Sequence, residues 1–214
     1  MSKRPIMVAM DLEGVLVPEA WIAFAEKTGI EELRLTTRDI SDYDKLMKRR
    51  LEILRENGLK LRDIQSVIET MDPMPGALEY MQWLQERYQN VILSDTFYEF
   101  ASPFMRKLGW PTLFCNSLVV NDDDNVIDYT LRLPDGKKHA TLALKNLNFT
   151  VIAMGDSYND TSMLAVADLG ILFRPPQNVI DEFPQFPVTT EFSEIQTLIE
   201  NFAVEQGPMK KVGQ

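Results

Sequence analysis

The first hydrophobic run of the chain, Ile6–Met10, contains no polar residue and leads directly into Asp11, Glu13 and Gly14. A run without alternating polar positions is typical of a central strand that is buried on both faces of a sheet. Open α/β sheets bind ligands at the carboxyl ends of their strands, where the two acids would emerge. The glycine allows a sharp turn and a close approach of a ligand to the backbone. The pattern therefore predicts a central strand that ends in two carboxylates at a ligand-binding edge.

A second hydrophobic run, Val151–Met154, leads in the same way into Asp156 and Asp160. Taken alone, Asp11 and Glu13 are more often an acidic strand end that faces water. Two buried strands that each end in acids instead favour one site that holds a hard cation through oxygen ligands.

Between these two runs the hydrophobic spacing first becomes helical. It predicts helices over residues 21–29, 42–57 and 61–71, with an irregular polar segment at 36–41. No convincing strand is predicted between residues 17 and 71. A block of helices inserted after the first strand is the expected form of a helical cap. We therefore predict a core formed by residues 1–16 and 75–214, and a cap formed by residues 17–74.

Strands and helices alternate again after the cap. The predicted strands are 91–93, 113–116, 151–154, 169–173 and 188–190, and the predicted helices are 77–88, 98–108, 137–147, 159–167 and 191–203. A hairpin is predicted over 118–133, with residues 121–125 as a solvated acidic turn rather than a calcium loop. Pro103 is expected to interrupt or kink its helix, and the polar tail 205–214 to be frayed. The fold class is therefore α/β: a Rossmann-like, doubly wound, mostly parallel sheet with an inserted all-helical cap and a β-hairpin.

Composition narrows the possible partners. The 214 residues carry a formal net charge of −10 and show no basic stripe, so we expect neither nucleic acid nor a membrane as a partner. The apolar stretch near the N-terminus is too short for a signal peptide or a membrane span. Cys115 is the only cysteine, so no internal disulfide can form and a cytoplasmic location is expected.

Polar residues from four distant segments are expected to meet at the carboxyl edge of the sheet. They are Asp11 and Glu13, then Ser94, then the Lys137/Lys138 pair, and then Asp156, Asn159 and Asp160. Together they provide a nucleophilic carboxylate, a second carboxyl group, a hydroxyl, an ammonium and metal-binding acids. Phosphoryl transfer needs these groups: a nucleophile, a proton shuttle and cations for the phosphoryl oxygens.

Arg50 lies within the predicted helix 42–57 and shares its apolar face with Tyr43, Met47 and Leu54. One interpretation is a side chain that runs along apolar surface and keeps its charge in water. The other is a guanidinium inside a cap pocket that binds a carboxylate in bidentate geometry. The spacing alone favours neither interpretation.

With these residues in this order, the chain resembles the haloacid dehalogenase superfamily of phosphatases. The first motif corresponds to Asp11–Leu16, the second to Ser94, the third to Lys137 and the fourth to Gly155–Asp160. The cap and the hairpin resemble the phosphoserine phosphatase branch. Segments 11–19 and 93–100 are similar to a bacterial subgroup described as bifunctional phosphoserine phosphatase and phosphoserine:homoserine phosphotransferase.

The resemblance implies a phosphomonoesterase or phosphotransferase that acts on L-phosphoserine through an aspartyl-phosphate, with water or homoserine as acceptor. Asp11 is the expected nucleophile and Glu13 the expected proton donor and acceptor. The cofactor Mg²⁺ is expected to bind Asp11, the backbone carbonyl of Glu13, and Asp156. The expected substrate-binding residues are Glu19 for the amino group, Arg50 for the carboxylate, and Ser94, Asp95, Lys137 and Asn159; Asp160 is expected behind them, orienting metal-bound water or Lys137.

Two features depart from the pattern of the superfamily. Glu13 stands where most members have Asp, and Gly14-Val15 stands where ordinary phosphoserine phosphatases have Ser-Thr. Glu keeps the carboxyl function and reaches one methylene further, so we expect acid–base chemistry with altered positioning that favours an alcohol over water as acceptor. Among the lysines, Lys137 is preferred, while Lys138 and Lys145 remain candidates for the same role.

Two alternatives remain from the sequence. One is a phosphatase of this superfamily that acts on another small metabolite, such as a sugar phosphate or a nucleotide. The other is a receiver-like signalling module with a phosphorylated Asp. Such a module carries its phosphoacceptor Asp on a later strand than its acidic pair, whereas here the acids lead on the first strand and a helical insertion of about 55 residues follows.

Overall fold

The computed structural model describes residues 4–36, 39–40 and 42–206. Its sheet has the strand order β4-β3-β2-β1-β5-β6-β7, so the first strand of the chain lies in the middle. Every neighbouring pair is parallel except the antiparallel hairpin of β3 and β4. The strands are β1 Ile6–Met10, β2 Gln89–Phe97, β3 Leu113–Val120, β4 Val126–Thr130, β5 Thr150–Gly155, β6 Leu169–Phe173 and β7 Val188–Thr189. The predicted mostly parallel α/β sheet with a hairpin is confirmed.

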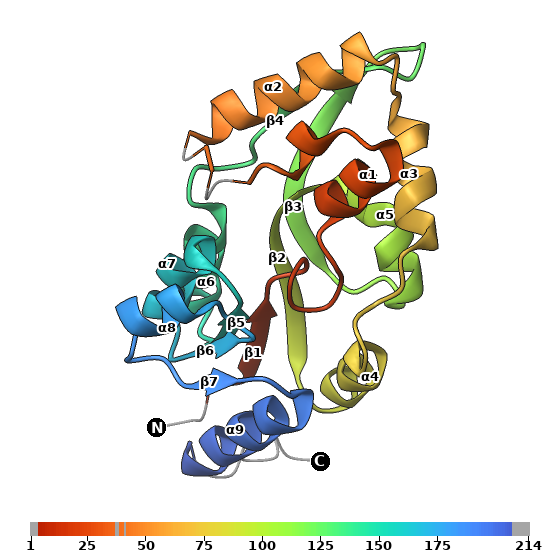
Figure 1. The fold of residues 1–214 in the computed structure, drawn as a ribbon. Coiled ribbons are helices and arrows are strands. Elements are labelled where there is room, and N and C mark those ends of the chain that lie inside the picture. The colour runs from red at the N-terminus through yellow and green to blue at the C-terminus, as the bar shows by residue number, and fades with distance from the viewer. Residues whose placement is uncertain (1–3, 37–38, 41, 207–214) are drawn as a thin grey trace.

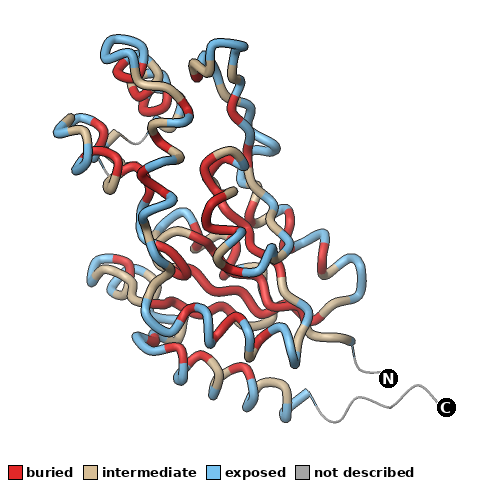
Figure 2. The backbone as a smooth tube through the Cα atoms, turned by 90° about the vertical axis from the view of Figure 1, so that its right-hand side faces the viewer, coloured by how far each residue is buried: buried red, intermediate tan, exposed pale blue. Residues whose placement is uncertain are grey.

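Helices cover both faces of this sheet, as Figure 1 shows. They are α1 Ala20–Thr28, η1 Glu31–Arg34, α2 Tyr43–Glu56, α3 Leu61–Thr70, α4 Ala77–Arg87, α5 Tyr98–Lys107, α6 Gly136–Asn146, η2 Tyr158–Asp160, α7 Thr161–Val166, α8 Gln177–Glu182 and α9 Phe192–Glu205. Alternate residues of β1 face opposite layers: Met7 and Ala9 pack with α6, α7 and α8, and Val8 and Met10 pack with α4 and α9. The central strands β1, β2, β5 and β6 therefore form a buried layer between two helical layers (Figure 2).

Helices α1, α2 and α3 lie beyond the carboxyl ends of the strands, above the sheet in Figure 1. Their apolar residues belong to the same hydrophobic cluster as α5 and one face of the sheet. For example, the rings of Trp21 in α1 and Phe100 in α5 meet edge to face, with 5.1 Å between their centroids. Helices α1, α2 and α3 thus cover the edge at which the sheet was expected to bind a ligand.

The hairpin turn forms hydrogen bonds with the start of α3. The carbonyl oxygen and Oδ2 of Asp124 accept hydrogen bonds from the backbone N–H groups of Leu61 and Arg62, at 3.0 and 3.1 Å. Lys60 donates to the carbonyl oxygen of Asp123 at 2.8 Å. The residues at 121–125 form the predicted turn, but Asp124 is only partly exposed because it also caps a helix.

Pro103 lies inside α5 and does not interrupt it, contrary to one of the two expected outcomes. A proline leaves the carbonyl group four residues earlier without its helical donor. That carbonyl belongs to Glu99, and it accepts a hydrogen bond from Nε2 of Gln65 in α3 at 2.9 Å. A side chain of α3 therefore replaces the missing backbone hydrogen bond.

Several other boundaries differ from the predictions. Strand β2 continues through Ser94 to Phe97, and β3 and the first arm of the hairpin are one strand. The predicted helix 159–167 is divided into η2 and α7, and the short α8 was not predicted. The expectations for residues 37–38, 41 and 207–214 lie outside the described residues.

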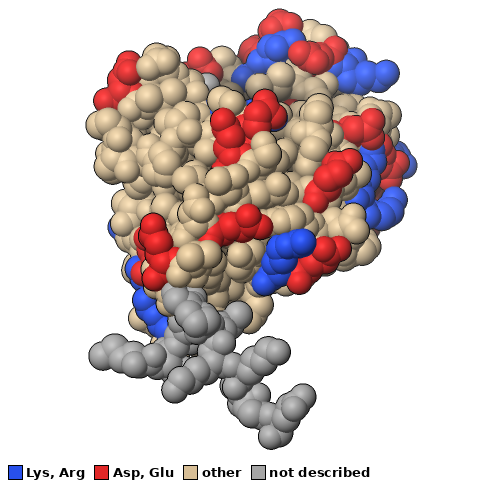
Figure 3. All heavy atoms as spheres, turned by 90° about the horizontal axis from the view of Figure 1, so that it is seen from below, with Lys and Arg blue, Asp and Glu red and all other residues tan. Residues whose placement is uncertain are grey.

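Two surface properties bear on partners. On the face seen in Figure 3, the described basic side chains are dispersed among acidic ones and do not form a stripe. Within the described ranges, no helix combines the length and the apolar character needed to cross a membrane.

Candidate active site

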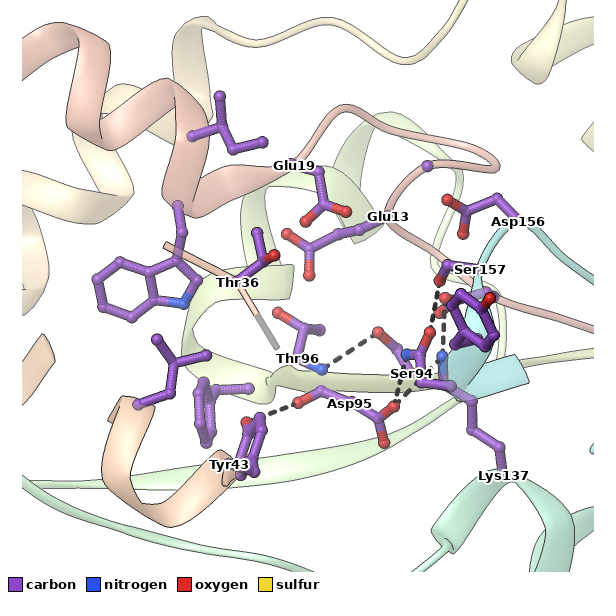
Figure 4. A pocket seen from close by; sticks show the side chains of 18 of the residues that line it. Glu13, Glu19, Thr36, Tyr43, Ser94, Asp95, Thr96, Lys137, Asp156 and Ser157 are labelled. Carbon is purple, nitrogen blue, oxygen red and sulfur yellow. Dashed lines mark hydrogen bonds and ion pairs between the residues drawn. The ribbon is translucent and has the colours of Figure 1, made fainter. Parts of the chain in front are cut away.

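A cavity of about 370 Å³ opens between the block of helices α1–α3 and the carboxyl edge of the sheet. It is lined by nine of the side chains that the sequence singled out, together with others such as Trp21, Tyr43 and Thr96. The nine are Asp11, Glu13, Glu19, Arg50, Ser94, Asp95, Lys137, Asp156 and Asn159. Asp160 is fully buried beside them and does not line the cavity. Figure 4 shows the labelled side chains converging from the sheet, from loops that include the one before α1, and from α2 and α6.

Strand pairing brings the acids together. Strands β1 and β5 run side by side with Met10 opposite Met154, and the N–H of Asp11 donates to the carbonyl oxygen of Met154 at 3.0 Å. One carboxylate oxygen from each of Asp11, Asp156 and Asp160 lies within 4.8 Å of the other two. Burial, followed by repulsion from Asp160, raises the pKa of Asp11 well above its usual value and that of Asp156 to about 7.

Gly14 is needed for this arrangement because its φ is +79° and its backbone lies against Asp156. A Cβ atom at this position would lie 2.5 Å from Oδ2 of Asp156, closer than real Cβ atoms approach a neighbour. The glycine that follows the two acids in the sequence thus leaves space for the carboxylate of Asp156, directly after β5.

Lys137 is the lysine that reaches the acid cluster. Its Nζ lies 2.7 Å from Oδ2 of Asp11, 2.7 Å from Oδ1 of Asp160 and 3.4 Å from Oδ2 of Asp95. Burial lowers the pKa of Lys137, but the attraction of these carboxylates outweighs burial and raises it well above the usual value. The ammonium group is therefore held in its charged form at the edge of the cavity.

The other two lysine candidates lie elsewhere. Lys138 pairs with Asp135 at 3.6 Å and is partly exposed. Lys145 donates to the carbonyl oxygen of Val166 at 2.9 Å and pairs with Asp168 at 3.1 Å, near the other end of α6. Of the three, the structure brings only Lys137 to Asp11.

Asp160 uses both oxygens within the protein. Oδ1 accepts from Lys137, and Oδ2 accepts from the backbone N–H groups of Asp156 and Ser157 at 3.0 and 3.2 Å. These bonds hold the loop after β5 and connect it to α6.

Glu13 links the first strand to α1. Its Oε1 accepts a hydrogen bond from the N–H of Ala20 at 2.8 Å, and the side chain of Thr96 also bonds to it. Burial outweighs these bonds and raises the pKa of Glu13, which favours the protonated form. Ser94 is buried nearby, and its Oγ accepts from the N–H of Thr96 at 3.2 Å.

Arg50 is 7% exposed, so the interpretation that it keeps its charge in water is wrong. Its guanidinium lies 4.5 Å from the ring centroid of Trp21, and one terminal nitrogen donates to the carbonyl oxygen of Leu35 at 2.8 Å. Among the described residues, Nε has no hydrogen-bond partner. Burial lowers the pKa of Arg50 to about 10, so the group stays charged at neutral pH.

Several lining residues were not singled out for the site by the sequence, among them Trp21, Tyr43 and Thr96. Trp21 supports Arg50, Thr96 bonds to Glu13, and the hydroxyl of Tyr43 lies 3.4 Å from the carbonyl oxygen of Asp95. Tyr43 shares a helix face with Arg50, which is the only signal in the sequence that could have identified it.

Comparison with known proteins agrees with the motif order. A family model described as haloacid dehalogenase-like hydrolase matches residues 7–168. A phosphoserine phosphatase of Pseudomonas syringae pv. tomato is 62% identical over 190 residues, which cover 89% of this chain and 80% of that protein. The phosphoserine phosphatase ThrH of Pseudomonas aeruginosa is 60% identical over 190 residues, which cover 89% of this chain and 93% of that protein. The chain belongs to the haloacid dehalogenase-like hydrolases, and the alternative of a receiver-like module is wrong.

Solved structures agree on the fold. A phosphoserine phosphatase structure described as a phospho-aspartyl intermediate analogue matches with a TM-score of 0.73 and 21% identity, covering 92% of this chain and 99% of that chain. A phosphoserine phosphatase in apo form matches with a TM-score of 0.72 and 24% identity, covering 91% and 98%. The α/β architecture predicted from the sequence is therefore shared with known structures over nearly the whole chain.

Proposed function

We propose that the protein is a Mg²⁺-dependent phosphatase that acts on L-phosphoserine through a phosphorylated Asp11, with water or homoserine as the acceptor. Two relatives with identities of 62% and 60% carry the name phosphoserine phosphatase, which supports the proposed substrate. Phosphoserine carries a phosphate, an ammonium and a carboxylate group. Its binding site therefore needs charges of both signs at separate places.

The observation that carries this proposal is the presence of Arg50 and Asp11 in the same cavity. Arg50 is a buried guanidinium whose Nε lacks a partner among the described residues. A substrate carboxylate would supply that partner, because a guanidinium and a carboxylate match in bidentate geometry. Glu19, whose carboxylate lies beside that of Glu13 in Figure 4, is assigned to the amino group of the substrate.

The acid cluster fits a hard divalent cation. Asp11 and Asp156 offer oxygen ligands close together, and their raised pKa values reflect burial and repulsion that a bound cation would offset. We assign Mg²⁺ to Asp11, Asp156 and the backbone carbonyl of Glu13. Asp160 is assigned to positioning because both of its oxygens already accept hydrogen bonds. When bound, the cation supplies charge neutralisation at the phosphoryl oxygens.

The proposed reaction has two halves. In the first, a carboxylate oxygen of Asp11 attacks phosphorus, the bond from phosphorus to the serine oxygen breaks, and protonated Glu13 gives its proton to that oxygen. In the second, the Glu13 carboxylate takes a proton from water or from the homoserine hydroxyl. The resulting oxygen attacks phosphorus, releases Asp11, and yields phosphate or phosphohomoserine.

Ser94 and Lys137 are assigned to the phosphoryl oxygens because a hydroxyl and an ammonium can donate to the charge that develops there. Asp95 and Asn159, which are joined by a hydrogen bond of 2.9 Å, line the cavity next to Lys137 and are assigned to the same part of the site. Lys137 also connects Asp11 to Asp160, so it orients the nucleophile as well.

The domain division and the choice of acceptor are part of the proposal. Residues 17–74 act as a cap that supplies Glu19 and Arg50, over a core formed by residues 1–16 and 75–214. The additional methylene of Glu13, relative to the Asp of most superfamily members, places its carboxyl group to favour an alcohol acceptor. A cytoplasmic location, expected from the single cysteine, completes the proposal.

Turnover assays test the substrate. The protein is incubated with Mg²⁺ and phosphoserine, with and without homoserine, and free phosphate and phosphohomoserine are measured. We expect phosphate release from phosphoserine, and phosphohomoserine when homoserine is added. Rapid release from a sugar phosphate or a nucleotide, with none from phosphoserine, would overturn the substrate and leave the family membership intact.

Two variants test the mechanism and the basis of recognition. Asp11→Asn is expected to lower kcat by about a thousandfold or more, because the nucleophile is lost. Arg50→Ala is expected to raise KM for phosphoserine and to leave KM for phosphoethanolamine, which lacks the carboxylate, nearly unchanged. A fully active Asp11→Asn variant, or equal effects of Arg50→Ala on the two substrates, would contradict the proposal.

A further inference from the structure

Two carboxylates accept hydrogen bonds from the ammonium group of Lys137, those of Asp11 and Asp160, and a third, that of Asp95, forms an ion pair with it. An ammonium has three N–H groups, and three carboxylates lie within reach of Nζ: those of Asp11, Asp160 and Asp95. In Figure 4 the side chain of Asp95 lies close to those of Ser94 and Lys137, the two residues to which the proposed function assigns the phosphoryl group. A phosphoryl oxygen that accepts from the third N–H of Lys137 therefore competes with the negative charge of Asp95 for the ammonium group.

The three contacts are unequal. Asp11 and Asp160 lie 2.7 Å from Nζ, and their side chains are 7% and 0% exposed. Asp95 lies 3.4 Å away and its side chain is 44% exposed. A longer, solvated ion pair is weaker than a short buried one, so the contact with Asp95 costs the least to break.

Asp95 also has a second, neutral partner. The oxygen that faces Lys137, Oδ2, accepts a hydrogen bond from Nδ2 of Asn159 at 2.9 Å. Ser157 donates to Oδ1 of the same Asn159 and so orients its amide group. Asp95 therefore keeps a bonded position at the edge of the cavity when Lys137 donates elsewhere.

The backbone of Asp95 is held independently of its side chain. Its carbonyl oxygen accepts from Nδ2 of Asn116 in β3 at 3.0 Å and from the hydroxyl of Tyr43 in α2 at 3.4 Å. Small changes in the contact with Lys137 can therefore occur in the side chain alone, without a shift of β2.

From these contacts we propose that Asp95 competes with the phosphoryl group for Lys137 and thereby weakens the retention of inorganic phosphate after hydrolysis. The inference rests on the proposed function for the place of the phosphoryl group between Ser94 and Lys137. It makes Asp95 a positioning residue for Lys137 whose negative charge promotes product release. A residue that only stabilised the local structure around β2 would not change the affinity for phosphate in this way.

The test measures the binding of inorganic phosphate directly, by calorimetry in the presence of Mg²⁺, and as product inhibition of turnover. Asp95→Asn removes the charge and keeps the shape, and it is expected to bind phosphate about tenfold more tightly. Asp95→Glu restores the charge and is expected to bind phosphate nearly as weakly as the unaltered protein. If phosphate release limits turnover, kcat of Asp95→Asn falls together with KM.

Asp135→Asn is the matched control. Asp135 is also a partly exposed acid near the start of α6, but it pairs with Lys138 and not with Lys137. A general loss of negative charge would tighten phosphate binding equally in both variants, whereas the proposal predicts a change only at Asp95. Unchanged or weaker binding in Asp95→Asn, or an equal gain in Asp135→Asn, overturns the inference. Because phosphate binding needs no turnover, failure to hydrolyse phosphoserine would refute the proposed function separately.

Discussion

The guanidinium of Arg50 stacks on the indole of Trp21, with 4.5 Å between its central carbon and the ring centroid. Both residues line the cavity, and Trp21 is itself held by Phe100 of the core. The aromatic face compensates part of the cost of burying the charge and sets the plane of the guanidinium. In the proposed function, recognition of the substrate carboxylate by Arg50 would therefore depend on Trp21, a neighbour that does not need to touch the carboxylate.

Trp21→Ala is expected to raise KM for phosphoserine about tenfold with a smaller change in kcat, because Arg50 loses its support while the nucleophile is unaffected. Trp21→Phe keeps an aromatic face and should recover most of the affinity. Steady-state kinetics with phosphoserine and with phosphoethanolamine provide the measurement. An equal rise in KM for both substrates would show that Trp21 acts on the whole cavity rather than through Arg50.

Gly14→Ala is expected to lower Mg²⁺ affinity and activity by about tenfold or more, because the new Cβ would overlap the carboxylate of Asp156. Gly29→Ala is the matched control: its φ is +71°, close to the +79° of Gly14, but its Cβ would meet nothing within 4 Å. Both variants should lose about 1–2 kcal/mol of stability from the left-handed backbone. Only Gly14→Ala should show the metal defect in a Mg²⁺ titration, and equal metal affinity in the two variants would refute the role of Gly14.

In the absence of divalent metal, the free energy of unfolding should decrease as the pH is raised from about 5 to about 8. The pKa of Asp156 is about 7 in the folded protein and 3.8 as an ordinary value, so the folded state binds this proton more tightly than the unfolded state. The stability that protonated Asp156 contributes is fully present below its ordinary pKa of 3.8. It is lost as the pH rises through its pKa of about 7 in the folded protein.

Denaturation in the presence of a chelator tests this pH dependence, with Asp156→Asn as the comparison. The variant should show a smaller decrease in stability with pH, and added Mg²⁺ should stabilise the unaltered protein more at pH 8 than at pH 5, because metal ligands must be ionised. Identical pH profiles for the two proteins would contradict the assignment of the raised pKa to Asp156.

Asp124→Ala in the hairpin turn is expected to reduce stability by about 1–2 kcal/mol, because α3 loses a capping oxygen and alanine disfavours the left-handed backbone of this position. Asp124→Asn keeps an acceptor and tolerates a positive φ, so its loss should be smaller. Asp122→Ala, at an exposed position of the same turn, should change stability by less than about 0.5 kcal/mol. Chemical denaturation of the three variants supplies the comparison, and equal losses at 122 and 124 would contradict a capping role.

Local patterns predicted most of the elements because burial and chain stiffness act over a few residues. The all-apolar run Ile6–Met10 is a central strand, and Gly29 ends α1 in a left-handed conformation, near the predicted position. The prediction for Pro103 was incomplete because the missing hydrogen bond is supplied by Gln65, a residue 38 positions earlier in the chain. A local rule describes the cost of the proline but not a distant donor.

The candidate site shows the same division between short-range and long-range information. Motif order placed Asp11, Ser94, Lys137 and Asp156 at one edge of the sheet, since strands that run parallel end on the same side. The choice between neighbouring lysines depended on the start of α6, where a shift of one residue turns a side chain by about 100°. Spacing alone also left two interpretations of Arg50, because the helix face does not show what packs against it.

By itself, the sequence determined the kind of fold, the acidic and hydroxyl groups available for phosphoryl chemistry, and their order along the strands. Each of these properties follows from residue type and short-range periodicity. Only the tertiary structure decided that the ammonium group of Lys137 pairs with carboxylates from three segments, and that Arg50 is buried against Trp21 with one nitrogen unpartnered among the described residues. Those contacts join residues far apart in the chain, and their distances depend on how the cap, the sheet and α6 pack together.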